Sequence, residues 1–226
     1  MKTNGGEAMI DITELVVRLS RTGAGVVVMW SMVFLSVVSV AVIIERFIFF
    51  WKNQGNVQEL ASDLHRLFLK GQYDEARALL KDREGFQSEV LSAALEGAPL
   101  GPNAVQELAT SAAKVQKLRF ERGLAFLGTL GNNAPFIGLF GTVLEIIAAL
   151  FELGTQSSAN ASAGAVMATL SAALAATAVG LLVALPAVAF FNYFNRRLKA
   201  FQTGSEALVH VLLAHMSGEK KTETAQ

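Results

Sequence analysis

Thr142 and Glu145 are polar residues within a long apolar stretch, where a polar side chain is expensive to bury unless water or a partner reaches it. They are three residues apart, and Ala149 follows four residues after Glu145, so all three share one face of a helix. A carboxyl group can bind and release a proton, and a hydroxyl group can donate and accept hydrogen bonds beside it. This face therefore predicts one wall of a narrow hydrated path.

A second face of small and hydroxyl side chains lies in the next apolar stretch. Its members recur at helical spacing and are Thr169, Ala173, Thr177, Gly180 and Ala184. We expect the two faces to line the path together. Two alternatives stay open. Threonine hydroxyls also bond to carbonyls of their own helix, and Glu145, only about 10 Å before Glu152 along a helix, could reach water at the membrane boundary without any transport role.

Three apolar stretches of membrane-spanning length would position these residues. The first runs from Thr22 to Ile44 without a charge, and the second runs from Gly123 to Phe151 with Glu145 as its one charge. The third follows a small polar loop within the charge-free stretch from Leu153 to Asn195. About 20 helical residues cross a hydrocarbon layer of about 30 Å, so we expect three transmembrane helices.

The residues before the first span are expected to form an amphipathic helix on the membrane surface. Their apolar side chains recur at helical spacing, at Ile12, Leu15, Val16 and Leu19. A helical extension of the first span is an equal alternative. A cleaved signal peptide is disfavoured because acidic residues precede the apolar run and Glu45-Arg46-Phe47 follows it in place of a small-residue cleavage site.

Lysine and arginine indicate the orientation of the spans. Both residues are frequent between the first two spans and in the C-terminal tail, whereas residues 152–164 contain neither. Arg46, Arg122 and Arg196-Arg197 lie close to three span ends. The positive-inside rule therefore places the middle segment and the tail in the cytoplasm, and the N-terminus and the short loop outside it.

Apolar periodicity predicts several helices between the first two spans, one around 60–68, a second around 73–80 and a third over 88–96. Gly71 would end the first of them, and GAPLGPN at 97–103 is the clearest break. Asn103 and Gln106 would form a capping pair for a long helix. We expect that helix to continue into the second span, because no strong breaker intervenes.

Composition and motifs exclude several functions. The 226 residues are 52% apolar and carry no net charge, which excludes a disordered chain and a globally basic nucleic-acid binder. The lack of cysteine excludes disulfides and thiolate metal sites. His210 and His215 are five residues apart and poorly placed to share a metal, and His65 completes no catalytic constellation. We therefore expect no enzyme, no cofactor and no metal site.

Two segments resemble a known family. The stretch LGTLGNNAPFIGLFGTVLEII at 127–147 and the stretch LAATAVGLLVALPAVAFFNYFNRR at 174–197 look like the second and third transmembrane segments of the proton-channel family that contains ExbB, TolQ and, more distantly, MotA. Residues 134–143 and 176–188 are the most specific parts. The large cytoplasmic segment after the first of three spans also resembles ExbB and TolQ and not the four-span MotA.

The resemblance implies an ion pathway. Thr142 and Thr177 match the family's threonines, which line the proton path beside a carboxylate from a partner. Ala172 stands where ExbB and TolQ carry a glutamate, and Glu145 stands where the family commonly has glycine. Glu145 is therefore a compensating carboxylate or a coincidence.

The resemblance also implies residues that shape the path, whereas Thr169 belongs to the expected path through its place on the polar face of the third stretch. Pro135 and Pro186 match the family's prolines, which interrupt helix hydrogen bonds. Small residues in the same spans, Gly138, Gly141 and Gly180, would permit close helix packing.

A motor is the function that the resemblance implies. Copies of the chain, five in ExbB-like complexes, would surround a single-span ExbD- or TolR-like partner with a transmembrane aspartate, in a bacterial inner membrane. A TonB- or TolA-like periplasm-spanning protein would be a further partner. A non-conducting ring scaffold of the same fold is the alternative, and the resemblance separates neither proton from sodium nor outer-membrane uptake from envelope maintenance or gliding.

The expected fold is an all-α membrane protein with three transmembrane helices and long cytoplasmic helical extensions, assembling as a ring. In chain order, we expect a periplasmic helix over 1–21, a first span over 22–44, a cytoplasmic helical domain over 45–123, a second span over 124–151, a periplasmic loop over 152–165, a third span over 166–194, and a cytoplasmic helix and tail over 195–226.

Overall fold

The computed structural model describes residues 23–54, 57–155 and 163–223, and every regular element in these ranges is helical. The amphipathic helix predicted over 1–21 and the middle of the loop predicted over 152–165 lie outside the described residues. The elements are α2 (Ala24–Lys52), α3 (Val57–Leu69), α4 (Tyr73–Lys81), α5 (Phe86–Gly97), the 3-10 turn η1 (Ala98–Leu100), α6 (Pro102–Glu121), α7 (Leu124–Thr155) and α8 (Ala163–Glu223).

Helices α2, α7 and α8 each contain a segment long and apolar enough to cross a membrane, over 25–52, 124–151 and 167–217. The three apolar stretches of the sequence, which predicted membrane spans, lie in these same three helices. The chain divides into two units, each with its own packing. The first comprises α2 up to Ile43, α7 from Phe126 onward and α8 up to Phe191, and we call it the three-helix unit.

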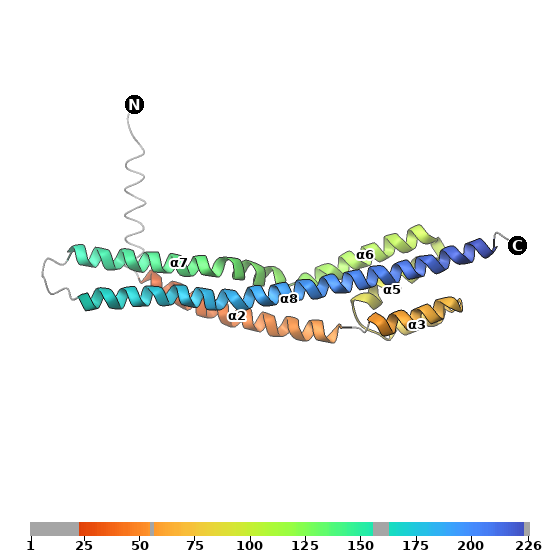
Figure 1. The fold of residues 1–226 in the computed structure, drawn as a ribbon, viewed down its shortest axis with the longest axis horizontal. Helices are drawn as coiled ribbons and strands as arrows, with labels where there is room; N and C mark the ends of the chain where they lie inside the picture. Colours follow the sequence, from red (N-terminus) through yellow and green to blue (C-terminus); the bar gives the residue numbers. More distant parts are fainter. Residues whose placement is uncertain (1–22, 55–56, 156–162, 224–226) are drawn as a thin grey trace, which may run out of the picture. The chain divides into compact units, whose positions relative to one another are not determined.

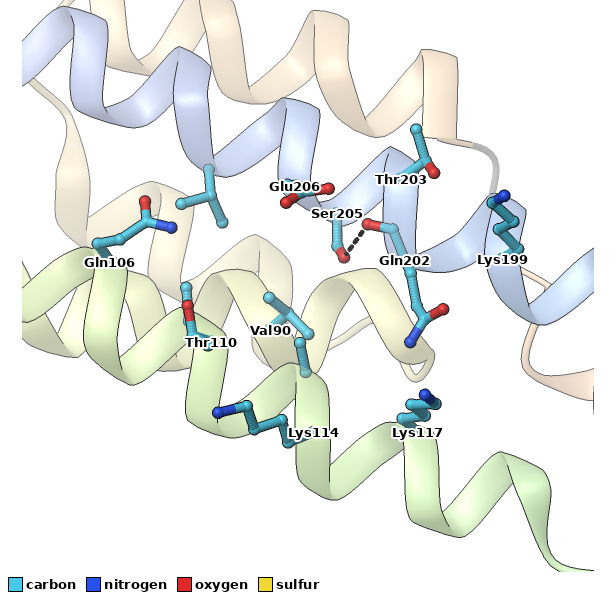
Figure 2. Close-up of a pocket in the computed structure, with 13 residues that line it drawn as sticks. Val90, Gln106, Thr110, Lys114, Lys117, Lys199, Gln202, Thr203, Ser205 and Glu206 are labelled. Carbon is cyan, nitrogen blue, oxygen red and sulfur yellow. Dashed lines mark hydrogen bonds between the residues drawn. The ribbon is translucent and has the colours of Figure 1, made fainter.

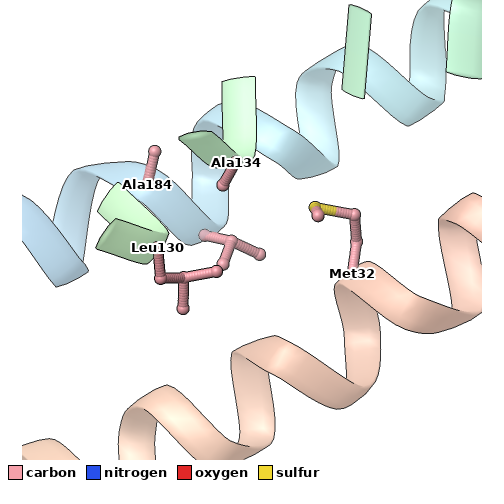
Figure 3. Close-up of a cluster of buried hydrophobic side chains, with 5 residues drawn as sticks. Met32, Leu130, Ala134 and Ala184 are labelled. Atoms are coloured by element: carbon pink, nitrogen blue, oxygen red, sulfur yellow. The ribbon is translucent and has the colours of Figure 1, made fainter. Parts of the chain in front are cut away.

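The three-helix unit is held together by small and branched side chains. Met32 from α2, Leu130 and Ala134 from α7, and Val183 and Ala184 from α8 are all buried in one cluster (Figure 3). Helices α7 and α8 run side by side in opposite directions (Figure 1), and three α7 glycines face α8 in an antiparallel register. Alanine and glycine at these positions let the helix backbones approach closely.

The second unit comprises the rest of the chain, from Ile44 to Ala125 and from Asn192 onward. Phenylalanines form its centre, and their rings make edge-to-face, tilted and stacked contacts at centroid distances of 4.9 to 6.5 Å. Such pairs add to the free energy gained from burying their area. They come from α2, α5, α6 and α8 and are Phe49, Phe50, Phe86, Phe120, Phe194 and Phe201.

The helices predicted around 60–68, 73–80 and 88–96 are present as α3, α4 and α5. Gly71 follows α3 with a φ of 66°, a conformation that glycine adopts without strain, as expected for the end of a helix. The predicted capping pair is wrong. Helix α6 begins one residue earlier than Asn103, with Gly101 as N-cap and Pro102 in the first turn, where the missing N–H of proline costs nothing.

The prediction that the long helix runs unbroken into the second span is also wrong. Arg122 leaves the helical region with φ −54° and ψ 129°, and Gly123 has a φ of 78°, so α6 ends at Glu121 and α7 begins at Leu124. Only glycine takes this left-handed conformation routinely, which is why the break falls here. By contrast, α8 is one helix that extends from Ala163 through the predicted end of the third span to Glu223.

Candidate functional site: polar residues in the three-helix unit

Helices α7 and α8 approach each other closely at a pair of glycines. A Cβ atom on Gly138 would lie 2.9 Å from the carbonyl oxygen of Ala176 and 3.1 Å from the Cα of Thr177. A Cβ atom on Gly180 would lie 2.8 Å from the carbonyl oxygen of Ala134. Real Cβ atoms do not make such contacts with a backbone, so both glycines are required for this crossing. The crossing positions Thr177 directly against α7.

Helix α2 packs against the next two turns of the same part of α7. A Cβ atom on Gly141 would lie 3.0 Å from a methyl group of Val28. One turn further, the side chain of Glu145 occupies the space beside Gly25, where a Cβ atom would come within 2.1 Å of Oε1. Gly25 therefore makes room for the carboxyl group of Glu145 between two helices that are long and apolar enough to span a membrane.

Two side-chain oxygens in this unit are buried and have no hydrogen-bond partner among the described residues: Oγ1 of Thr177 and Oε2 of Glu145. A hydroxyl or carboxyl oxygen without a partner in an apolar interior costs about 1–3 kcal/mol or more. Unpaired polar atoms of this kind are rare in native proteins and call for a ligand, a proton or water. Both belong to residues that the sequence placed on the ion pathway.

The other two predicted hydroxyl groups are placed differently. Thr142 is buried, but its hydroxyl donates to the carbonyl oxygen of Leu139 at 2.6 Å, as in the alternative reading of a threonine bonded to its own helix. Thr169 is half-buried on α8 and has an interaction partner of its own. Among the described residues of the unit, the buried side-chain oxygens without a partner are therefore those of Thr177 and Glu145.

These two residues lie at different levels of the unit. Thr177 lies against Gly138, whereas Glu145 is seven residues further along α7 and lies against α2. Seven residues correspond to about 10 Å along a helix axis. The structure thus arranges two separate polar positions about two turns apart.

The small residues of the predicted face on the third span pack inside the chain. Ala173, Gly180 and Ala184 are buried, and Gly180 contacts the backbone of α7. Pro135 and Pro186 lie within α7 and α8, where each lacks the N–H that a helix interior would use.

A buried arginine lies in the part of α2 that belongs to the second unit. The side chain of Arg46 is 8% exposed, donates to the Glu45 carboxylate at 2.5 Å, and stacks 4.8 Å from the ring centre of Phe49. The guanidinium of Arg119 lies over the same ring at 5.6 Å. Cations at this position are anchored by one carboxylate and one aromatic ring, which fixes positive charge at the end of the apolar segment.

A groove of about 370 Å³ lies between α6 and α8 in the same unit (Figure 2). Lys114, Lys117 and Lys199 bring three ammonium groups to its lining, and Glu206 brings one carboxylate. The hydroxyl of Ser205 donates to the carbonyl oxygen of Gln202 at 2.9 Å, and no histidine lines the groove to activate it. The groove offers charge and not a catalytic pair.

Sequence reasoning missed Gly25, the residue that makes room for Glu145. Nothing in the first stretch distinguishes it from other small residues, because its role depends on the register between two helices 120 residues apart in the chain. The sequence carries one signal for such a residue. It is a glycine in one apolar span at the same membrane depth as a charged residue in another span.

Comparisons with known proteins identify the family. The model of the MotA/TolQ/ExbB proton channel family matches residues 82–207, which include Thr142, Glu145 and Thr177. The "Biopolymer transport protein ExbB" of Neisseria gonorrhoeae is 35% identical over 145 residues, which are 64% of this chain and 64% of that protein. The protein of the same name from Xanthomonas campestris pv. campestris is 43% identical over 81 residues, 36% of this chain and 31% of that protein.

The family model covers more than half of the chain, including all of α7 and α8 as far as residue 207. The three helices of membrane-spanning length agree with it. This membrane protein therefore belongs to the MotA/TolQ/ExbB proton channel family, as an ExbB/TolQ-like member.

Proposed function

We propose that this chain is the ring-forming subunit of a proton-driven motor in a bacterial inner membrane. The observation that carries the proposal is the unpaired, buried hydroxyl of Thr177 at the glycine crossing of α7 and α8. A buried polar atom without a partner destabilises the folded protein. The cost is removed when a proton, a water molecule or a partner's carboxylate forms a hydrogen bond with it. Family membership supports the choice of a proton among these.

In this proposal, several copies, five as in ExbB-like complexes, surround the span of an ExbD- or TolR-like partner. An aspartate in that span is protonated from outside and releases its proton inside. Thr177 and Thr142 lie along its path, and Glu145 collects protons nearer the outer end of α7. One charge crossing 100 mV supplies about 2.3 kcal/mol, and this free energy drives the movement of the partner against the ring. A TonB- or TolA-like protein would transmit the movement.

The proposed orientation follows the positive-inside rule. The predicted segments 45–123 and 195–226 are cytoplasmic, the spans are 22–44, 124–151 and 166–194, and residues 1–21 and 152–165 are periplasmic. The buried Arg46 at the end of the first span supports this orientation, since an anchored cation would be costly on the translocated side. Pro135, Pro186, Gly138, Gly141 and Gly180 shape the path, and Thr169 lies nearer its outer end.

A non-conducting ring scaffold is the second candidate. Ala172, an exposed residue of α8, favours it because ExbB and TolQ carry a glutamate at the matching position. The chain would then assemble with its partner but transport no ions.

Ion flux into liposomes distinguishes the two candidates. The chain is reconstituted with and without its co-encoded single-span partner, and a proton or a sodium gradient is applied with a membrane potential. We expect proton flux that requires the partner. The absence of flux of either ion from an assembled complex would favour the scaffold, and flux of sodium alone would reassign the ion.

A further inference from the structure

Two histidines that are 150 residues apart in the chain meet in the second unit. Nδ1 of His65 on α3 lies 3.2 Å from Nε2 of His215 on α8. The ring centres are 5.1 Å apart and the ring planes are inclined by 58°. The family comparison assigns no role to either residue, and the proposed ion pathway uses neither.

Buried neighbours hold each imidazole in place. Leu64 and Phe68 are almost fully buried and lie one residue before and three residues after His65. Leu212 is fully buried three residues before His215, and the ring of Phe68 lies 6.1 Å from that of His215. The rings themselves remain accessible, because His65 is exposed and His215 is only half-buried. The pair is thus preorganised by packing but open to solutes.

The separation of the two nitrogens suits a shared metal ion. Zn–N bonds are about 2.0–2.1 Å long, so two imidazole ligands of a tetrahedral ion lie about 3.3 to 3.4 Å apart. The observed 3.2 Å is close to this value, and small ring rotations would aim both lone pairs at one point. We propose that His65 and His215 form a binding site for a divalent transition-metal ion, and that Zn²⁺ is the ion it binds.

The proton balance of this binding is simple. In the hydrogen bond, one of the two facing nitrogens carries a hydrogen and the other accepts it. Metal binding needs both facing nitrogens unprotonated, so the donating ring moves its hydrogen to its other nitrogen and remains neutral. The ion replaces that hydrogen between the rings, and no other bond changes.

The composition of the site predicts its selectivity. No third histidine, cysteine, aspartate or glutamate joins the pair within the described ranges, so water would fill the other coordination positions. Two imidazoles favour Cu²⁺, Ni²⁺ and Zn²⁺ over Mg²⁺ and Ca²⁺, which prefer oxygen ligands. Binding would clamp α3 to the C-terminal part of α8 and stabilise the folded unit, because the unfolded chain does not bring the two histidines together.

The test titrates the tag-free, full-length protein in detergent with ZnCl₂, using calorimetry and thermal unfolding. His210 lies on α8, is exposed and takes no part in the pair, so His210→Gln is the matched control for His65→Gln and His215→Gln. We expect one Zn²⁺ per chain and a rise in Tm of about 3–6 °C at zinc tenfold above Kd. His65→Gln and His215→Gln should lose affinity about tenfold or more, His210→Gln should bind normally, and MgCl₂ should have no effect.

A spectroscopic measurement on the unmutated protein guards against variants that fold poorly. Cu²⁺ bound at the site should show coupling to two nitrogen nuclei in its electron paramagnetic resonance spectrum. Zinc affinity unchanged in His65→Gln, or Cu²⁺ coupled to fewer than two nitrogens, would overturn the proposal. So would the absence of zinc binding in the unmutated protein, which would leave the pair as a plain hydrogen bond between α3 and α8.

Discussion

Three threonines and Glu145 in the three-helix unit were predicted from sequence to serve one path. Their side chains differ in whether they have a hydrogen-bond partner. The hydroxyl of Thr142 is satisfied by its own helix, whereas that of Thr177 is not. Mutation of the two residues should therefore have unequal consequences. The difference arises from local bonding, which neither spacing nor motif could reveal.

Thr177→Val is expected to abolish partner-dependent ion flux and at the same time stabilise the protein. Valine keeps most of the shape and removes a buried hydroxyl without a partner, so the free energy of unfolding should rise by about 1–3 kcal/mol. Thr142→Val removes an already satisfied hydroxyl and is the matched control, with a smaller loss of flux. Flux in liposomes and thermal unfolding measure both effects. Unchanged flux in Thr177→Val would remove this residue from the path.

Gly25→Ala tests the role of Glu145 without changing Glu145 itself. The added Cβ would lie 2.1 Å from Oε1 and 2.5 Å from Cγ of Glu145, so the whole Glu145 side chain must turn away to another rotamer. Alanine favours a helix by about 1 kcal/mol over glycine, so we expect stability to be retained. If Glu145 collects protons, we expect flux to fall in Gly25→Ala and in Glu145→Gln alike.

Ser31→Ala is the control for this pair, because Ser31 is an exposed residue of α2 whose hydroxyl only bonds to the carbonyl of Val28. Flux is measured over a range of external pH. Normal flux at every pH in both Gly25→Ala and Glu145→Gln would assign Glu145 to the membrane boundary or to structure.

At the scale of helices, the periodicity of apolar residues predicted the existence of nearly every described helix. Boundaries were less predictable, because they depend on single backbone conformations. Gly123 breaks the long helix through a positive φ, and Gly101 with Pro102 begins α6 ahead of the predicted cap at Asn103. A lone glycine in a sequence carries no sign of which conformation it adopts. The contact of Gly25 with Glu145 depends on tertiary register and was equally out of reach.

The crossing of α7 and α8 predicts different costs for two glycine substitutions. Gly180→Ala places a Cβ 2.8 Å from a backbone oxygen of the facing helix, which cannot move alone, so we expect a loss of about 1–3 kcal/mol in unfolding free energy. Gly141→Ala meets a methyl group of Val28 at 3.0 Å, which can shift, and should cost less. Thermal unfolding in detergent measures both. Equal costs would show that the helices separate more easily than their contacts indicate.

At the scale of the whole molecule, one long helix serves both units. Helix α8 has 61 residues and contributes small side chains to the three-helix unit and Phe194 and Phe201 to the aromatic centre of the second. The sequence predicted a boundary at residue 195 because polar and basic residues begin there. The change in composition marks the point where α8 passes from one unit to the other, but the helix itself continues. The orientation of the whole chain across the membrane decides which end of the proposed path faces outward, and therefore whether Glu145 lies at the proton entrance.

The lack of cysteine allows this orientation to be tested with single substitutions. Leu100, the last residue of η1 and 76% exposed, belongs to the segment proposed to be cytoplasmic. Gly164, exposed at the start of α8, belongs to the segment proposed to be periplasmic. In intact spheroplasts, a membrane-impermeant maleimide should label Gly164→Cys and spare Leu100→Cys, whereas lysis should expose both. The reverse pattern would invert the protein and, with it, the side from which Glu145 is charged with protons, because the anchored Arg46 and the basic segments would then lie outside the cytoplasm.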